Sequence, residues 1–208
     1  MTRRDSDRRK RTNDPEGMRQ RLLDVAFAAF TAQGYNATSV HDLKREAGAT
    51  GGALSHHFPT KKDLGLAVLR DRVADAVEET WIAPVRAAPN AAEGIQSVFA
   101  AIAAELDGKG AVSGCPLNNL ALELSRQDAD FQAVIDDIFG RWRHAIAERI
   151  RADQEAGRFA HLEAEAFATF VVAAYSGAMA MAKAGQSTEP LRVCAALLGQ
   201  MMTGKAAA

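Results

Sequence analysis

The stretch from Thr38 to Leu64 constrains the fold of this 208-residue chain most, because helix-start and helix-stop signals alternate along it. Ser39 lies three residues before Asp42, a spacing that predicts a reciprocal cap at the start of a helix. Gly48 follows the last apolar residue of that helix, where a residue without a Cβ atom can adopt the left-handed conformation that ends it. Thr50 can then cap a second helix, so we expect a turn of about three residues.

The second helix is predicted from Gly51 to about His57, and it is too short to be stable alone. Pro59 stops it, and Thr60 with Asp63 forms another cap that starts a long helix. A short helix held at an angle by a glycine-containing turn is the helix-turn-helix arrangement, whose second helix can enter the major groove of DNA. This stretch is therefore predicted to read DNA.

A helix is also predicted before this pair, from Asp14 to Gln33. Asp14 can cap it, Pro15 suits its first position, and Gly34 follows its end. Its apolar residues recur at helical spacing and predict a buried stripe. We assign residues 15–62 to a three-helix DNA-binding domain.

The first fourteen residues, 1–14, are rich in arginine and have almost nothing apolar to bury, so we predict a disordered basic arm. Two interpretations of this arm are open. It is a solvated tail, or it lies along DNA phosphate and in a minor groove beside the reading helix.

Composition predicts an all-α protein of about nine helices, because the apolar residues, 48% of the chain, recur at helical spacing. Charge is divided unevenly. Residues 1–70 carry 13 Lys and Arg against 8 Asp and Glu, whereas the remainder carries 12 against 18. The positive end contains the helix-turn-helix, as contact with phosphate requires.

Two cysteines are too few for a disulfide framework, which fits a cytoplasmic protein. The arginine-rich start is not followed by the apolar segment of a secretory signal. The uncharged run from Ala166 to Ala182 is better explained by a buried interface helix than by a membrane span.

Residues 63–208 are assigned to a second helical domain. The helix that starts at Thr60 is predicted to run to about Ala83 and to join the two domains, with a break bracketed by Pro84 and Pro89. Small residues dominate a later helix, Glu163–Lys183, and its apolar surface covers more than one side. This pattern predicts a homodimer in which the last two helices of each subunit form a four-helix bundle. A central helix of a monomer is the alternative.

The N-terminal region resembles the DNA-binding domain of TetR-type transcriptional regulators. The residues that carry this resemblance are Leu22, Leu23, Val25, Ala26, Phe30, Gly34, Tyr35, Thr38, Leu43, Ala47, Gly48, Leu54, His57, Phe58, Lys61 and Leu64. The rest of the chain resembles the C-terminal domain of one TetR subgroup. The residues behind that second likeness are Gly114, Cys115, Pro116, Leu117, Asn119, Leu120, Leu122, Glu123, Leu124, Ser125, Trp142, Gly157 and the stretch Gly177–Lys183.

The helix-turn-helix and its resemblance together indicate a set of DNA-contacting residues. They are Thr38, His41, Gly51, Gly52, Ala53, Ser55, His56, Lys61 and Lys62. The helix N-terminus points amide groups at phosphate, and glycines let the backbone come close. The family usually has tyrosine where Ser55 stands and often a basic or polar residue at Gly51, so backbone contacts and the two histidines His41 and His56 are expected to matter more here.

The resemblance also implies that the C-terminal domain senses a small-molecule effector in a pocket between helices. The candidate lining residues are Trp81, Phe99, Cys115, Asn119, Glu123, Phe139, Trp142, Phe170 and Tyr175, and each has ordinary core packing as an alternative role. Cys115 begins a helix, whose dipole is expected to lower the pKa of the thiol, and Lys183 could supply a nearby positive charge. These two residues are therefore candidates for a sensor of oxidants or electrophiles, with an inert buried thiol as the alternative.

The sequence thus predicts a cytoplasmic, dimeric repressor that binds a near-palindromic, double-stranded operator and leaves it when an effector binds. No cofactor, metal site, membrane partner or enzymatic activity is expected, since no HExxH, paired CxxC or catalytic constellation accompanies the histidines or Cys115. Two alternatives are a helical adaptor without DNA binding and an enzyme that uses Cys115 as a nucleophile.

Overall fold

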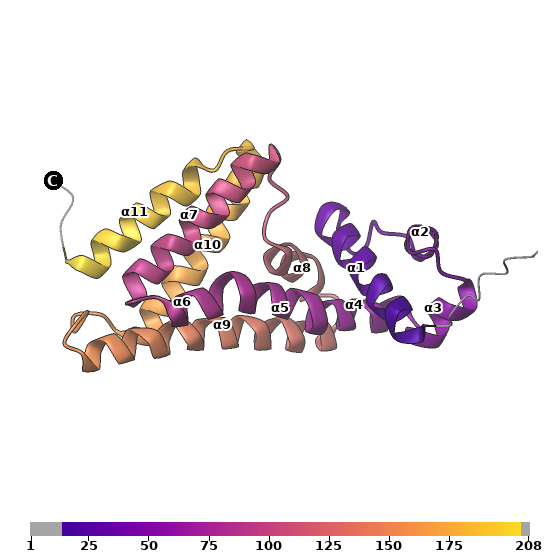
Figure 1. Cartoon of the computed structure of the whole chain (residues 1–208), viewed down its shortest axis with the longest axis horizontal. Coiled ribbons are helices and arrows are strands. Elements are labelled where there is room, and N and C mark those ends of the chain that lie inside the picture. The colour runs from indigo at the N-terminus through magenta and orange to yellow at the C-terminus, as the bar shows by residue number, and fades with distance from the viewer. Residues whose placement is uncertain (1–13, 205–208) are drawn as a thin grey trace, which may run out of the picture.

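The computed structural model describes residues 14–204, and every regular element in that range is a helix (Figure 1). The all-α class is confirmed. A small N-terminal group of helices forms one end of the molecule. The opposite end is formed by α7 (Ala91–Lys109), α10 (Ala164–Gly185) and α11 (Glu189–Thr203). The predicted basic arm, apart from Asp14, lies outside the described residues.

Three helices form the N-terminal domain: α1 (Pro15–Gln33), α2 (Val40–Glu46) and α3 (Gly51–His57). Their shared core consists of fully or almost fully buried apolar side chains, which are Leu22, Leu23, Ala26, Phe30, Leu43, Ala47, Leu54 and Phe58. Because α2 and α3 have only seven residues each, their stability depends on this shared core.

Local capping determines where these helices begin and end. The carboxylate of Asp14 accepts the N–H of Gly17 at 2.9 Å, and the hydroxyl of Thr50 accepts the N–H of Ala53 at 3.1 Å. Gly48 has φ of +63°, the left-handed conformation expected for the turn.

The reciprocal cap predicted at the start of α2 is only half formed. Ser39 accepts the N–H of His41, but the carboxylate of Asp42 pairs with Arg45 at 2.7 Å instead of reaching back. An arginine three residues along the same helix face offers that carboxylate a closer charged partner.

A single long helix joins the two domains. It consists of α4 (Lys61–Val68), a wide turn η1 (Leu69–Val73), α5 (Ala74–Val77), a second wide turn η2 (Glu78–Ile82) and α6 (Ala83–Ala87). In the wide turns the backbone hydrogen bonds span five residues instead of four, so the helix is locally under-wound.

The predicted break, bracketed by Pro84 and Pro89, occurs at Ala88, but the helix does not end at about Ala83 as expected. The helix continues to Ala87, because Pro84 lies in the first turn of α6, directly after η2. The N–H of Ala83 bonds the carbonyl of Glu78, five residues back, and this wider turn leaves room for the proline ring. The chain leaves the helix at Ala88 instead, before Pro89.

The C-terminal domain continues with α7 (Ala91–Lys109), α8 (Pro116–Leu124), α9 (Ala129–Glu155), α10 (Ala164–Gly185) and α11 (Glu189–Thr203). α10 lies where the sequence predicts a helix, Glu163–Lys183. Counting the connecting helix as one, the described residues contain nine helices. α9 runs alongside the connecting helix, and α10 packs against both α9 and α11 (Figure 1).

One buried carboxylate connects two helices of the C-terminal domain. Asp153 in α9 is 0% exposed, and its carboxylate accepts the N–H of Ala91 at the start of α7 at 2.6 Å. It also pairs with Arg158 at 2.9 Å and Arg149 at 3.5 Å. A single carboxylate therefore links the first turn of α7 to the last turns of α9.

By length and composition, α10 resembles a membrane-crossing helix. Its inner face, which includes Ala168, Val171, Val172 and Ala178, is nevertheless buried against neighbouring helices. We therefore interpret α10 as a core helix of the C-terminal domain.

Candidate DNA interface and ligand cavity

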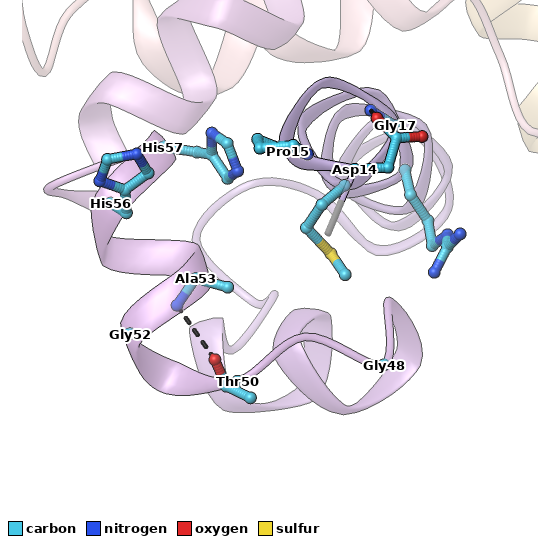
Figure 2. Close-up of a pocket in the computed structure, with 11 residues that line it drawn as sticks. Asp14, Pro15, Gly17, Gly48, Thr50, Gly52, Ala53, His56 and His57 are labelled. Atoms are coloured by element: carbon cyan, nitrogen blue, oxygen red, sulfur yellow. Dashed lines mark hydrogen bonds between the residues drawn. The ribbon is translucent and has the colours of Figure 1, made fainter. Parts of the chain in front are cut away.

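The helix α3 presents one polar face to solvent and fixes the other in the core. Leu54 is buried, whereas Gly51, Gly52, Ser55 and His56 are exposed. Thr50 caps the start of α3 by accepting the N–H of Ala53 (Figure 2). This is the arrangement that a reading helix needs, with backbone donors and short side chains at its open end.

The two glycines leave the surface of α3 open. A Cβ atom built on Gly51 or Gly52 would meet no heavy atom within 4 Å. Their absence of side chains is thus not required by packing inside the subunit. It allows a partner such as a phosphate backbone to approach the helix axis closely.

An open depression of about 860 Å³ lies between the start of α1 and α3 (Figure 2). His57, half-buried, faces the start of α1 across it, and Arg21 contributes a cation to the wall formed by α1. Arg21 was not among the predicted contacts. Arg21 lies six residues after Pro15 and three after Met18, on the same face of α1. This spacing is the sequence signal that could have identified it.

Three of the predicted DNA contacts are used inside the protein. Thr38 is only 5% exposed, and its hydroxyl donates to the carbonyl of Gly34 at 2.7 Å, so it supports the turn after α1. Lys61 donates to the carbonyl of Tyr35 at 2.7 Å and lies 4.4 Å from the centre of its ring. Burial lowers the pKa of Lys61.

Lys62 forms ion pairs with carboxylates of the C-terminal domain. Its ammonium lies between Asp128 at 2.6 Å and Asp130 at 2.7 Å, at the start of α9. Hydrogen bonds to these two carboxylates raise the pKa of Lys62 above its usual value. The structure therefore places Lys62 at the joint between the two domains, whereas His41, on α2, remains exposed.

Four of the predicted effector residues surround one small cavity of about 60 Å³ in the C-terminal domain. Its walls are Val73, Ala76, Val77, Thr80, Trp81, Cys115, Pro116, Leu117, Trp142 and Tyr175. The ring of Trp81 lies 5.0 Å from that of Trp142 and 4.9 Å from that of Tyr175, measured between centroids. These rings come from η2, α9 and α10, so the cavity exists only in the folded domain.

Two further predicted residues support the cavity without lining it. Phe99 packs edge-on against Trp81 at 5.4 Å and Tyr175 at 5.6 Å. Phe139 stacks on Trp142 at 6.3 Å with an interplanar angle of 10°.

The remaining three predicted residues do not reach the cavity. Phe170 is 46% exposed on the outer face of α10. The amide of Asn119 donates to the carbonyl of Ser113 at 3.0 Å and so holds the loop before α8. Glu123 accepts the N–H groups of Tyr35 at 2.9 Å and Asn36 at 2.6 Å, directly after α1.

The lowered pKa expected for Cys115 is wrong. The side chain begins α8, and the N–H groups of Leu117 and Asn118 do favour the thiolate, but burial outweighs them and raises the pKa of the thiol. Lys183 lies close by, since its side chain borders Gly114. With the proton retained at neutral pH, Cys115 is a poor nucleophile. The alternative of an inert buried thiol therefore fits Cys115 better than a sensor of oxidants or electrophiles with Lys183.

Among residues 14–204 no group of three or more His, Cys, Asp or Glu side chains could hold a metal ion.

Comparison with known families agrees with this geometry. Residues 22–68 match the family of bacterial regulatory proteins of the tetR type, and residues 91–197 match the C-terminal domain of LmrA/YxaF-like transcriptional regulators. The chain belongs to the TetR family. It is a DNA-binding transcriptional regulator with the TetR fold.

Relatives of this TetR-family regulator match it along most of their length. The HTH-type transcriptional repressor DhaR of Mycobacterium sp. (strain GP1) is 29% identical over 182 residues, which is 84% of this chain and 86% of DhaR. The HTH-type transcriptional regulator LmrA of Bacillus subtilis (strain 168) is 27% identical over 142 residues, which is 64% of this chain and 71% of LmrA.

Solved structures share the fold of this TetR-family regulator. A TetR transcriptional regulator from Chloroflexus aurantiacus J-10-FL has a TM-score of 0.80 at 24% identity and covers 91% of this chain and 96% of its own. The regulatory protein TetR from Rhodobacter sphaeroides has a TM-score of 0.79 at 22% identity, and the match covers 88% of this chain and 97% of that protein's chain.

Proposed function

We propose that this TetR-family regulator is a cytoplasmic homodimeric repressor that binds a near-palindromic operator and leaves it when a small molecule occupies the C-terminal cavity. The observation that carries the proposal is the position of two surfaces at opposite ends of the chain. The exposed face of α3 lies at one end, and an exposed apolar face of α10 and α11 lies at the other (Figure 1).

The apolar face supports a dimer. Five of the six large apolar side chains that are exposed in the described residues lie on α10 and α11. They are Phe170, Met181, Val193, Leu197 and Met201. Small residues, Ala173, Gly177 and Ala180, line the same outer side of α10 and would let two such helices approach closely. A contiguous apolar surface of this kind favours a partner, and a second copy of the chain supplies the same surface.

Selection of bound genomic fragments tests the function as a whole. We expect the purified protein to retain a few fragments with two related half-sites about 34–36 Å apart, since each subunit would place α3 in successive major grooves. Binding should weaken steeply as salt is raised, because phosphate contacts release counterions. Retention of random DNA with the same affinity as the selected fragments would overturn the proposal.

The dimer surface makes a separate prediction. Leu197→Glu is expected to raise the dimer dissociation constant at least a hundredfold, since it would bury an unpaired carboxylate from each subunit at the interface. Affinity for the selected operator should fall in parallel, because one reading helix then binds without the other. Sedimentation and a shift assay measure the two effects.

The matched control is Leu122→Glu. Leu122 is 81% exposed on α8, outside the α10 and α11 surface, so this variant should remain dimeric and bind DNA normally. A Leu197→Glu protein that stays dimeric at working concentration would contradict this mode of assembly.

α8 provides a route from cavity to DNA-binding domain. Cys115, Pro116 and Leu117 at its start line the cavity, and Glu123 near its end holds the backbone of Tyr35 and Asn36. A ligand that moves the start of α8 would therefore also move the carboxylate that fixes the end of α1. Such differential contact is what couples an effector to operator affinity.

Loss of this contact should be visible in amide exchange. Glu123→Ala would leave the N–H groups of Tyr35 and Asn36 without their acceptor, so we expect their hydrogen exchange to accelerate about tenfold. Glu148→Ala is the control, because it removes an exposed carboxylate of α9 whose one ion pair within residues 14–204 is with Arg151 in the same helix. Equal exchange at Tyr35 and Asn36 in the two variants would mean that Glu123 does not secure the joint.

A further inference from the structure

Two indole N–H groups lack acceptors inside the C-terminal domain. Trp81 is 2% exposed and Trp142 is 0% exposed, and neither Nε1 atom has a hydrogen-bond partner among the residues that the structure describes. A buried donor without an acceptor is costly and uncommon, so two such donors on residues that line one cavity require an explanation.

The two indoles differ in their surroundings. The N–H of Trp81 lies near the hydroxyl of Tyr175 without reaching hydrogen-bond geometry. Burial raises the pKa of that hydroxyl, and the indole N–H opposes the rise. Among residues 14–204 the N–H of Trp142 has no hydrogen-bond partner. The stronger need for an external acceptor is therefore at Trp142.

The walls of the cavity carry no formal charge. Its remaining polar groups are Thr80, Cys115 and Tyr175, and burial raises the pKa of both Cys115 and Tyr175, so their protons are retained at neutral pH. An ionic ligand would lose its hydration here without gaining a counter-charge. The site therefore favours a neutral molecule.

The enclosed space limits the size of that molecule. The cavity has about 60 Å³, whereas a protein cavity of about 150 Å³ is known to hold benzene. Thr80 is exposed, so the cavity opens to solvent at η2 and a ligand can extend outward there. A compact group of about five non-hydrogen atoms is the appropriate probe, since it is smaller than benzene.

We propose that this cavity binds a small neutral molecule with a hydrogen-bond acceptor, such as a ketone or amide carbonyl, and that the indole N–H groups of Trp142 and Trp81 donate to it. The effector role of this ligand depends on the function proposed above. Its binding does not.

The location of Trp81 explains how such a ligand would act. Trp81 belongs to η2, one of the two wide turns in the helix that continues to α4 and the DNA-binding domain. Wide turns of this type occur often at functional sites, because one residue can be taken up or released in the helix. A ligand that bonds to Trp81 therefore acts directly on the helix that carries the DNA-binding domain.

The test uses the protein's own fluorescence, because Trp81 and Trp142 are the two tryptophans of the chain. Butanone, its isostere 2-methylbut-1-ene and the anion propionate have similar sizes but differ in acceptor and charge. We expect butanone to shift the emission to longer wavelength, the alkene to bind about tenfold more weakly, and propionate to have no effect. If the alkene binds as tightly as butanone, or propionate binds as well, the proposal is wrong.

Two variants distinguish the effect of the indole N–H on ligand preference from the effect of side-chain packing. Trp142→Phe keeps an aromatic ring but removes the N–H, so the preference for butanone over the alkene should fall about fivefold, with Trp81 as the reporter. Phe99→Leu is the control, because it alters the packing behind Trp81 and Tyr175 and leaves both donors in place. An unchanged preference in Trp142→Phe would overturn the assigned donor. If that variant does not fold, the three-ligand comparison on the unaltered chain decides the proposal.

Operator binding, followed in the same samples, distinguishes the two levels of inference. Release of the operator by butanone, but not by propionate, supports both the ligand class and its effector role. Binding of butanone with the expected preference, without any change in operator affinity, retains the ligand site and overturns its regulatory role.

Discussion

The Gly52→Glu variant should fold as well as the unaltered chain and bind the operator at least a hundredfold more weakly. Gly52 is exposed in the first turn of α3, and a Cβ atom there meets nothing within 4 Å, so the side chain adds no clash. Replacing a helical glycine usually stabilises a helix by about 0.5–1 kcal/mol, and a carboxylate suits the first turn. Stability should therefore not fall.

The loss of affinity has an electrostatic cause. In the proposed complex the start of α3 faces DNA phosphate, and each subunit would bring one new negative charge to it. Like charges held together at an interface cost several kcal/mol, so two copies exceed the roughly 2.7 kcal/mol that a hundredfold loss represents. Fluorescence anisotropy with the selected operator measures the affinity, and thermal unfolding measures the stability.

Gly108→Glu is the matched control for Gly52→Glu. Gly108 is also exposed and helical with nothing within 4 Å of a built Cβ atom, but it lies near the end of α7 in the C-terminal domain. This variant should bind the operator normally. If Gly52→Glu bound within about threefold of the unaltered chain, which is roughly 0.7 kcal/mol, α3 would not face the phosphate backbone.

The second large effect is expected at Asp153. We expect Asp153→Ala to lower the free energy of unfolding by about 3–5 kcal/mol, the usual consequence of removing one partner from a buried ion pair. The substitution leaves the N–H of Ala91 without its 2.6 Å acceptor and Arg149 without a carboxylate. The Arg149 side chain is 19% exposed and donates to the carbonyl of Pro89 at 2.6 Å, but its Nε atom is unbonded, and without Asp153 its charge would lack a carboxylate.

Urea unfolding measures this loss, with Asp137→Ala as the control on the same helix. Asp137 is exposed, and among the residues that the structure describes it pairs only with Arg141, four residues on, so its removal should cost less than about 1 kcal/mol. Asp153→Asn should fall between the two, since an amide oxygen can still accept the N–H of Ala91. Similar losses in Asp153→Ala and Asp137→Ala would show that the buried carboxylate does not organise α7 and α9.

Local signals were accurate because they act within a single turn of helix. Asp14, Thr50 and the pair Thr60 with Asp63 cap helices as their spacing predicts, with the last pair forming the full reciprocal box. The exceptions have local causes as well: Asp42 pairs with Arg45 instead of completing the cap of α2. Pro84 does not end its helix, since the wide turn η2 accommodates it.

Aromatic character indicated three residues of the cavity wall, although Phe170 is exposed and both Phe99 and Phe139 pack behind the wall. Trp81, Trp142 and Tyr175 do meet at one cavity, because large apolar rings are buried together in any compact helical domain. Polar residues were harder. Thr38 and Glu123 both bond to the backbone near the end of α1, and neither use can be read from the neighbouring sequence.

The sequence by itself determined the helices, their caps, the turn between α2 and α3 and membership of a DNA-binding family. Only the tertiary structure decided that Glu123 accepts a hydrogen bond from the backbone of Tyr35, that Lys62 forms an ion pair with Asp128 and that Cys115 keeps its proton. The physical reason is range. Capping and helical periodicity depend on residues a few positions apart, whereas burial and ion pairing depend on neighbours that only the folded chain brings together.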